Sequence, residues 1–173
     1  MNIHTAKSVE KRGDKEVYAW LEKLGIAHDY YEHPPAPTAE IAAQYWKDID
    51  AAHCKNLFFR NHKGNQHYLV IFHYQQNILI RDLEQRLKQG KLTFASPERM
   101  ERYLKISPGS VSPFGLIHDK DHHIIVFLDE NLLQYDRISF HPNLNEASLV
   151  VGFGDFMRYL EAVGNRYEFL SLY

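Results

Sequence analysis

Two runs of aromatic and β-branched residues, one on each side of a turn, constrain the fold of this chain most strongly. The runs are Cys54–Arg60 and Gln66–Tyr74, and the segment between them, Asn61–Asn65, contains asparagine, lysine and glycine. Aromatic and β-branched residues favour extended strands, whereas asparagine and glycine favour tight turns. The pattern therefore predicts a β-hairpin across residues 54–74.

Segments with strand and helix signals are interleaved along the rest of the chain. Residue type predicts further strands over His28–His33, Phe114–His118, His123–Leu128, Arg137–Phe140 and Ser148–Phe153. Apolar residues at helical spacing predict helices over 14–25, 38–47, 80–89 and 96–104, a helical turn over 131–135, and a last helix that ends at Gly164. Thr38 and Ser96 are the expected N-caps of two of these helices. Because strands and helices follow one another in mixed order, we predict a single α+β domain around a mixed, mostly antiparallel sheet.

Length and composition agree with one folded domain. The chain has 173 residues, 45% of them hydrophobic, which is enough for a buried core. We assign residues 14–173 to this domain and the polar residues 1–13 to a mobile N-terminal tail. The net charge of −2 gives no general signal for binding polyanions, although a local basic patch can still contact RNA.

Cysteine count and hydropathy limit the cellular setting. Cys54 is the single cysteine, which excludes an internal disulfide and a zinc site built from several cysteines. The N-terminal 15 residues lack the apolar core of a signal peptide, and no apolar run approaches the roughly 20 residues that span a bilayer. We therefore expect a cytoplasmic protein with no membrane partner.

The link Gly109–Gly115 has the composition of a loop that binds a ligand through its backbone. It contains a glycine, two hydroxyls and a proline in the order Gly109, Ser110, Val111, Ser112, Pro113. Glycine allows unusual dihedrals and proline fixes φ, so consecutive N–H groups can be held in one outward-facing array. Such an array can bind a carbonyl oxygen or a phosphate. An ordinary turn is the alternative, since the same residues favour turns.

Lys55 and His141 are the other two candidates for chemistry. Lys55 lies in an apolar strand, where it is either a solvated surface lysine or a cation facing a cleft, and strand alternation does not decide which face is buried. His141 follows a strand and precedes a proline, so it is either a turn residue or a binding residue on a loop. Asn145 and Ser148 have the same two interpretations, as local hydrogen-bonding residues or as pocket residues.

Other motifs of catalysis or metal binding are weak in this sequence. The histidine-rich segment His118–His123 matches no zinc motif and has the composition of an exposed turn. Cys54 has no histidine partner in the sequence pattern and is expected to be buried and inert. The sequence contains no nucleophile elbow, Walker loop or dinucleotide fingerprint. The helical region Arg81–Lys105 is mildly basic, either a solvated face or a surface suited to an RNA backbone.

Four short motifs occur in an order that resembles a known family. They are Glu32–Pro34 with Pro37–Thr38, Cys54–Phe58, Pro108–Gly115 and His141–Asn145. In this order the chain resembles the YbaK/prolyl-tRNA-synthetase-associated aminoacyl-tRNA deacylases, and within them the freestanding prolyl-tRNA deacylases. The resemblance extends from about Val17 to Leu172. It implies an α+β domain whose central sheet is partly closed.

The resemblance also assigns roles to residues. It implies that Lys55 lies at the substrate ester and that the loop at Gly109 and Ser110 acts on the aminoacyl carbonyl through backbone groups. It implies that His141 holds the 3′ end of the tRNA. The other residues carried over as substrate-binding are Thr38, Val111, Ser112, Pro113, Asn145 and Ser148. Serine stands at 110, 112 and 148 where alanine or threonine is common in the family, which weakens any statement about amino-acid preference.

The implied activity is trans-editing, in which water hydrolyses the ester of a mischarged tRNA. The resemblance implies Ala-tRNA(Pro) as substrate, no cofactor and no metal, and help from the terminal ribose hydroxyl. Prolyl-tRNA synthetase or an elongation factor is a candidate partner beside the acceptor end of the tRNA. Two alternatives stay open: deacylation of Cys-tRNA(Pro), and a module that binds tRNA or a synthetase without catalysis.

Overall fold

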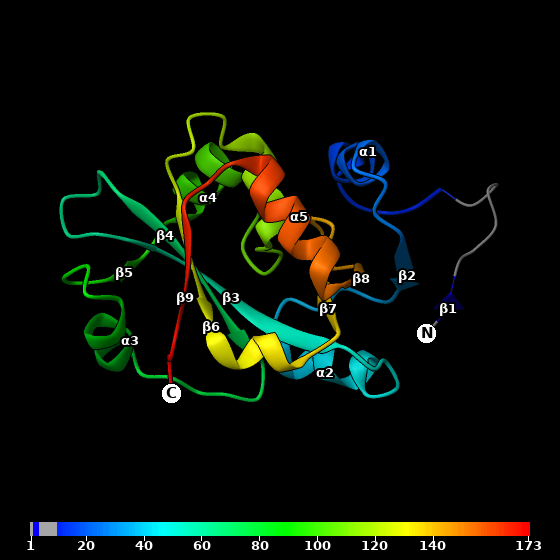
Figure 1. The fold of residues 1–173 in the computed structure, drawn as a ribbon, viewed down its shortest axis with the longest axis horizontal. Helices are drawn as coiled ribbons and strands as arrows, with labels where there is room; N and C mark the ends of the chain where they lie inside the picture. Colours follow the sequence, from blue (N-terminus) through cyan, green and yellow to red (C-terminus); the bar gives the residue numbers. More distant parts are fainter. Residues whose placement is uncertain (1, 4–9) are drawn as a thin grey trace.

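The predicted hairpin forms the middle of a mixed sheet (Figure 1). The computed structural model describes residues 2–3 and 10–173. Strands β3 (Ala52–Arg60) and β4 (His67–His73) pair antiparallel, from Cys54 opposite His73 to Arg60 opposite His67. The segment between them makes the predicted turn, since the Asn61 side chain accepts hydrogen bonds from the backbone N–H groups of Asn65 and Gln66. The hairpin prediction is confirmed.

The other strands extend the sheet on both sides of this hairpin. The order is β1-β2-β8-β7-β3-β4-β6-β9, with β5 paired to β3 outside this path. Their bounds are β1 (Asn2–Ile3), β2 (His28–Glu32), β5 (Thr93–Phe94), β6 (Ile125–Asp129), β7 (Arg137–Phe140), β8 (Ala147–Gly152) and β9 (Tyr167–Leu170). Pairs β3–β7, β4–β6 and β6–β9 are parallel, and the others are antiparallel. The mixed, mostly antiparallel sheet is therefore confirmed. The expectation of a partly closed sheet is corrected: among the described residues the sheet is open, because β1 and β9 stand at the two ends of its path and do not pair with each other.

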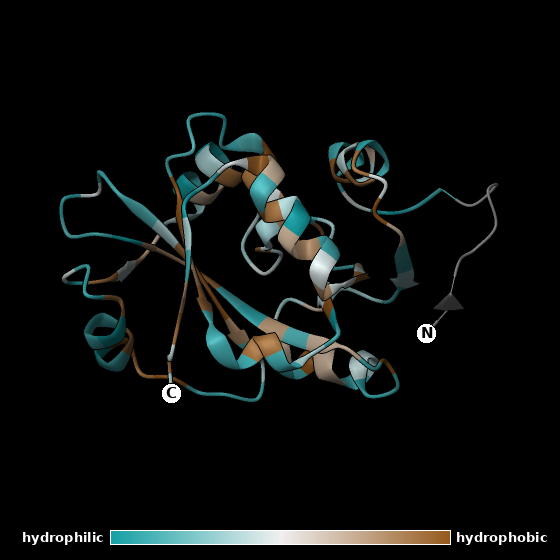
Figure 2. Ribbon diagram, in the orientation of Figure 1, coloured by the Kyte–Doolittle hydropathy of each residue, from teal (hydrophilic) through white to brown (hydrophobic). Residues whose placement is uncertain are grey.

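Helices cover both faces of this sheet. They are α1 (Lys15–Lys23), α2 (Ala39–Trp46), α3 (Ile80–Leu87), α4 (Pro97–Leu104) and α5 (Phe153–Val163), with 3₁₀ helices η1 (Pro113–His118) and η2 (Glu130–Gln134). Leu69 and Ile71 of β4 join a core with α1, α4, η1 and α5, whereas Tyr68, Val70 and Phe72 pack against α3. Successive strand residues face opposite ways and both faces are covered, so residues 68–72 of β4 are all buried aromatic or aliphatic residues. Figure 2 shows this as brown strands inside polar loops and helix surfaces.

The structure confirms the predicted N-caps Thr38 and Ser96 and adds a third, Asp14. Asp14, Thr38 and Ser96 each accept a hydrogen bond from a backbone N–H of the first turn that follows. Gly164 ends α5 with φ of 90°, a conformation that glycine adopts without strain. Helix α3 ends two residues before the predicted limit, because Lys88 is already left-handed. None of the helices in the described ranges is long and apolar enough to cross a membrane.

One strand prediction is wrong. Residues 114–118 form η1 instead of a strand, with Ser112 as N-cap and Pro113 at its first position. The Ser112 hydroxyl accepts a hydrogen bond from the N–H of Phe114, and Pro113 presets the helical φ. All residues from Pro113 to Ile117 are buried, so the apolar run carried no alternation that could mark one exposed face.

The structure describes only part of the predicted mobile tail, residues 1–13. Residues 1 and 4–9 of the predicted mobile tail lie outside the described residues. Within residues 10–13, the N–H of Arg12 donates to the Tyr30 hydroxyl, and the Tyr18 hydroxyl donates to the carbonyl of Arg12. Arg12 also forms an ion pair with Glu146. This part of the segment is held against the domain.

Candidate active site

A gap along one edge of β3 creates the site. That edge pairs with β7 at Ala52 and His53, and with β5 at Phe59 and Arg60. Between them, residues 54–57 have no strand partner on this side among the described residues. The backbone groups of this edge are therefore open to a ligand.

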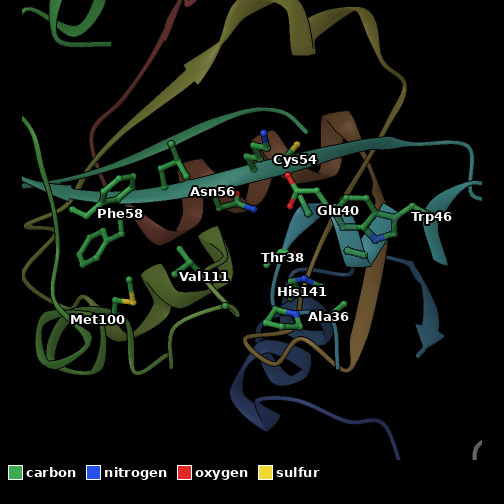
Figure 3. A pocket seen from close by; sticks show the side chains of 17 residues that line it. Ala36, Thr38, Glu40, Trp46, Cys54, Asn56, Phe58, Met100, Val111 and His141 are labelled. Atoms are coloured by element: carbon green, nitrogen blue, oxygen red, sulfur yellow. The ribbon is translucent and has the colours of Figure 1, made fainter. Parts of the chain in front are cut away.

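A pocket of about 310 Å³ occupies this gap (Figure 3). Because the pocket meets the edge of β3, consecutive residues of the strand line it, whichever face their side chains occupy. Its lining is mostly apolar and comes from six segments of the chain: Ala36–Glu40 and Ala42 with Trp46, Cys54–Phe58, Phe94, Met100, Gly109 with Val111, and His141. The predicted residues Thr38, Lys55, Gly109, Val111 and His141 are thus brought together, from segments far apart in the sequence.

Lys55 lies at the edge of this pocket with its ammonium oriented by a neighbouring loop. Its Nζ donates to the carbonyl of Gln76 at 3.0 Å and to Oδ1 of Asn77 at 2.7 Å. Both acceptors are neutral, so the positive charge is not cancelled by an ion pair. An ammonium has three donors, which leaves one for a substrate.

Gly109 is the residue of the loop whose backbone only glycine fits. Its φ is +86°, and a Cβ built there would lie 3.0 Å from Cβ of Pro37. Its carbonyl accepts a hydrogen bond from the side chain of Asn145 at 3.3 Å. Among the described residues, the N–H groups of Gly109 and Val111 donate no hydrogen bond, and both residues line the pocket. These two amides are the candidate donors to a developing oxyanion.

The remaining loop residues support the loop from behind. Ser110 is buried outside the pocket lining, its hydroxyl accepts from the N–H of Asn145, and its own N–H donates to Ser107. Ser112 caps η1, and the carbonyl of Pro113 accepts from the Tyr159 hydroxyl. Ser110, Ser112 and Pro113 thus fix the loop through these contacts and are absent from the pocket lining. Asn145, also absent from the pocket lining, ties the loop to the segment that carries His141.

His141 presents a neutral ring to the pocket. Its Nδ1 lies 2.7 Å from the carbonyl of Ala147, and since a carbonyl only accepts, Nδ1 carries the proton. Burial is the main cause that lowers the pKa of His141 to about 4; the nearby rings of His33 and His53 act in the same direction, and the Ala147 hydrogen bond acts against it. At neutral pH, Nε2 is therefore a hydrogen-bond acceptor.

Ser148 lies behind the pocket wall in a buried hydrogen-bond chain. The indole N–H of Trp46 donates to its hydroxyl at 3.3 Å, and Nε2 of His33 lies 3.0 Å from the same oxygen. The Nδ1 of His33 lies 2.9 Å from the carbonyl of Pro34, which makes it the donor and leaves Nε2 to accept from Ser148. Ser148 does not line the pocket, but its hydroxyl orients Trp46, which does.

Several lining residues were not predicted from the sequence. They are Glu40, Trp46, Asn56, Phe94 and Met100. Asn56 follows Lys55 in the same motif, and its buried Oδ1 has no hydrogen-bond partner in the structure. Glu40 follows the N-cap Thr38 by two residues, a position usual for an acidic residue in any helix. Only the gap in the sheet distinguishes these residues from ordinary core and surface positions.

Cys54 and the histidine-rich segment contribute no further chemistry. Cys54 lines the pocket but is buried, and burial raises the pKa of its thiol, which keeps it protonated and weakly nucleophilic. Among the described residues, one group has metal-ligand spacing: Asp14, Glu16 and His118. There His118 contacts both carboxylates, with its Nε2 2.6 Å from Asp14 and its Nδ1 3.2 Å from Glu16, so an ion-pair cluster accounts for the arrangement.

Comparison with known proteins gives one consistent result. Residues 33–159 match the model of the aminoacyl-tRNA editing domain. The chain is 37% identical over 158 residues to the prolyl-tRNA editing protein ProX of Acetoanaerobium sticklandii, covering 90% of this chain and 95% of that protein. It is 31% identical over 155 residues to prolyl-tRNA synthetase associated domain-containing protein 1 of Xenopus laevis, covering 87% and 92%.

Solved structures share the fold. One, described as a proposed trans-editing enzyme for prolyl tRNA synthetase, superposes with a TM-score of 0.67 at 24% identity, covering 91% of this chain and 95% of that one. Another, the hypothetical protein APE2540, superposes with a TM-score of 0.65 at 17% identity, covering 90% and 99%. At these identities the likeness concerns the α+β fold alone.

Proposed function

Because this chain belongs to the aminoacyl-tRNA editing family and is thereby an aminoacyl-tRNA deacylase, we propose that its substrate is a mischarged proline tRNA, above all Ala-tRNA(Pro). The observation that carries the proposal is the convergence of Lys55, the Gly109 loop and His141 on one apolar pocket of about 310 Å³. The two relatives described above are named for prolyl-tRNA editing and for association with prolyl-tRNA synthetase, which supports a proline tRNA as the nucleic acid.

Editing is needed because a synthetase discriminates poorly against smaller apolar amino acids. An amino acid that lacks one methylene loses only about 1–3 kcal/mol of binding free energy in a hydrophobic pocket. A synthetase site made for proline therefore also admits alanine. A second pocket can reject proline by size and hydrolyse the alanyl ester. The apolar lining at Phe58, Met100 and Val111 is suited to a small side chain of this kind.

In the proposed reaction, water attacks the ester carbonyl that binds at the Gly109 loop. The free N–H groups of Gly109 and Val111 stabilise the oxyanion, an effect on the order of 3 kcal/mol for each donor. The Lys55 ammonium stabilises the same negative charge by electrostatics. The C–O bond to the ribose then breaks, and the released alkoxide takes up a proton to become the terminal hydroxyl.

His141 contributes through its acceptor nitrogen. The neutral ring accepts a hydrogen bond at Nε2, and a ribose hydroxyl of the terminal adenosine is a donor of the required kind. The hydroxyl so held lies beside the ester and is the proposed aid to the attacking water. Neither Lys55, which is cationic, nor His141, whose pKa is lowered to about 4, is suited to act as the general base at neutral pH.

Release of labelled amino acid from Ala-tRNA(Pro), Cys-tRNA(Pro) and Pro-tRNA(Pro) tests the proposal. The wild type is expected to release alanine and leave proline bound, and Lys55→Ala is expected to abolish release. Lys55→Met is the matched variant, because it keeps the length of the side chain without its charge and is expected to be equally inactive. Preferred release of cysteine would show that the substrate is Cys-tRNA(Pro) and not Ala-tRNA(Pro). Tight tRNA binding without release of any amino acid would indicate a module that only binds.

The tRNA is expected to approach by its acceptor end. A prolyl-tRNA synthetase or an elongation factor is the proposed partner that supplies recognition of the rest of the tRNA. This part rests on the naming of the relatives and on the absence of a strong positive charge, since the net charge is −2.

A further inference from the structure

The proposed substrate carries a positive charge that neither Lys55, the Gly109 loop nor His141 binds. An aminoacyl ester has a free α-amino group, which binds a proton near neutral pH. Burying an ammonium in an apolar pocket without a counter-charge is unfavourable. A site that hydrolyses aminoacyl esters is therefore expected to hold an anion close to the ester carbonyl.

Glu40 is the acidic residue at that place. Among the described residues that line the pocket, it is the only carboxylate, and it lies there with Lys55, Gly109 and His141. In Figure 3, Glu40 lies between Asn56 and Trp46, with its carboxylate turned toward the Asn56 side of the pocket. The carboxylate makes no hydrogen bond or ion pair within the described ranges, while the Lys55 ammonium is bound to Gln76 and Asn77.

A structural role accounts for only part of this arrangement. Glu40 is in the first turn of α2, where a negative charge interacts favourably with the helix dipole. Glu98 occupies the same position in α4, directly after the first helical residue, and it is also exposed. Glu98 does not line the pocket, so the dipole explains the residue type at both positions but not the placement of Glu40.

We propose that Glu40 is the binding residue for the α-ammonium group of the aminoacyl ester. The inference rests on the proposed deacylase function and adds a specificity to it. The site distinguishes esters with a free α-amine from those in which the amine is absent or acylated. In this arrangement the α-ammonium binds Glu40 while the carbonyl oxygen meets the amides of Gly109 and Val111.

The test compares two esters of the same tRNA. Alanyl-tRNA(Pro) is converted to lactyl-tRNA(Pro) by deamination, which replaces the α-ammonium by a hydroxyl of similar size. Hydrolysis of both is measured for the wild type, Glu40→Gln and Glu98→Gln. Each rate is divided by the uncatalysed rate of the same ester, because the ammonium itself makes the ester more labile.

The wild type is expected to prefer the alanyl ester by roughly 10- to 100-fold in kcat/KM, the range of a hydrogen bond between charged groups. Glu40→Gln is expected to lose this preference by slowing the alanyl reaction while leaving the lactyl reaction unchanged, and Glu98→Gln is expected to keep it. An unchanged alanyl-to-lactyl ratio in Glu40→Gln would overturn the role of Glu40 and leave the deacylase function standing. Failure of the wild type to hydrolyse either ester would overturn the proposed function and this inference with it.

Discussion

Replacing Gly109 by alanine tests whether the loop geometry is the source of activity. With φ of +86°, the new residue adopts a left-handed conformation that costs an L-amino acid about 1–2 kcal/mol. Its Cβ would also lie 3.0 Å from Cβ and 3.2 Å from Cα and the carbonyl oxygen of Pro37. Since Pro37 is rigid and two of these atoms are backbone, the loop is expected to move away from the pocket.

The structure offers a control with the same backbone strain and no such contact. Gly90 has φ of +80°, and a Cβ there meets nothing within 4 Å. Gly90→Ala is expected to lower the free energy of unfolding by on the order of 1 kcal/mol in urea denaturation, and Gly109→Ala by at least as much, because it adds the contact with Pro37. Only Gly109→Ala is expected to reduce kcat, by about 100-fold or more, because the donors to the oxyanion are displaced.

Release of alanine from Ala-tRNA(Pro) by both variants, under single-turnover conditions, is the assay. If the rates of Gly109→Ala and Gly90→Ala agreed within about two-fold, the assignment of the loop would be refuted. Loss of one oxyanion donor lowers kcat by about 100-fold or more, so such a small difference would mean that no donor was displaced. A loss of activity in Gly90→Ala as large as that in Gly109→Ala would attribute the effect to general destabilisation.

Three further predictions concern the groups that support the pocket. Ser148→Ala leaves Trp46 and His33 without their buried partner, so urea denaturation is expected to show a loss of about 1–3 kcal/mol. Asn145→Ala is expected to lower kcat more than it raises KM, because it releases the carbonyl of the glycine loop; equal thermal stability with unchanged kcat would contradict this. The pKa of His141 is lowered to about 4 in the folded protein, so the unfolded chain binds the proton more tightly. Its contribution to stability is therefore complete above pH 6.5 and lost as the pH falls toward 4, and His141→Gln is expected to flatten the dependence of the unfolding midpoint on pH in that window.

The sequence predicts the elements whose signals are local. The hairpin of β3 and β4, and the caps Thr38 and Ser96, are found as predicted, because turn and capping preferences act within a few residues. The segment 114–118 was assigned wrongly because it is buried on all sides, and its apolar run is compatible with either a strand or a helix.

The composition of the site depends on contacts between distant segments. The alternation of β3 does not show whether Lys55 lies at a pocket. The gap between β7 and β5 along the edge of β3 puts it there, and that gap is a feature of strand pairing and not of the sequence of β3. Ser110 and Asn145 have the residue types of ligand-binding groups, yet the Ser110 hydroxyl accepts from the backbone N–H of Asn145, and the Asn145 side chain donates to the carbonyl of Gly109. Glu40 looks like any acidic residue in a first helical turn until the pocket is seen around it.

A structure with a stable substrate analogue tests the central claim most directly. The analogue is 3′-amino-3′-deoxyadenosine with alanine attached to its 3′ amine as an amide, a bond far more resistant to hydrolysis than the ester. We expect it to bind in the pocket along β3, with its carbonyl oxygen at hydrogen-bond distance from the N–H groups of Gly109 and Val111. Binding at another surface, or binding in the pocket with the carbonyl turned away from both amides, would contradict the account.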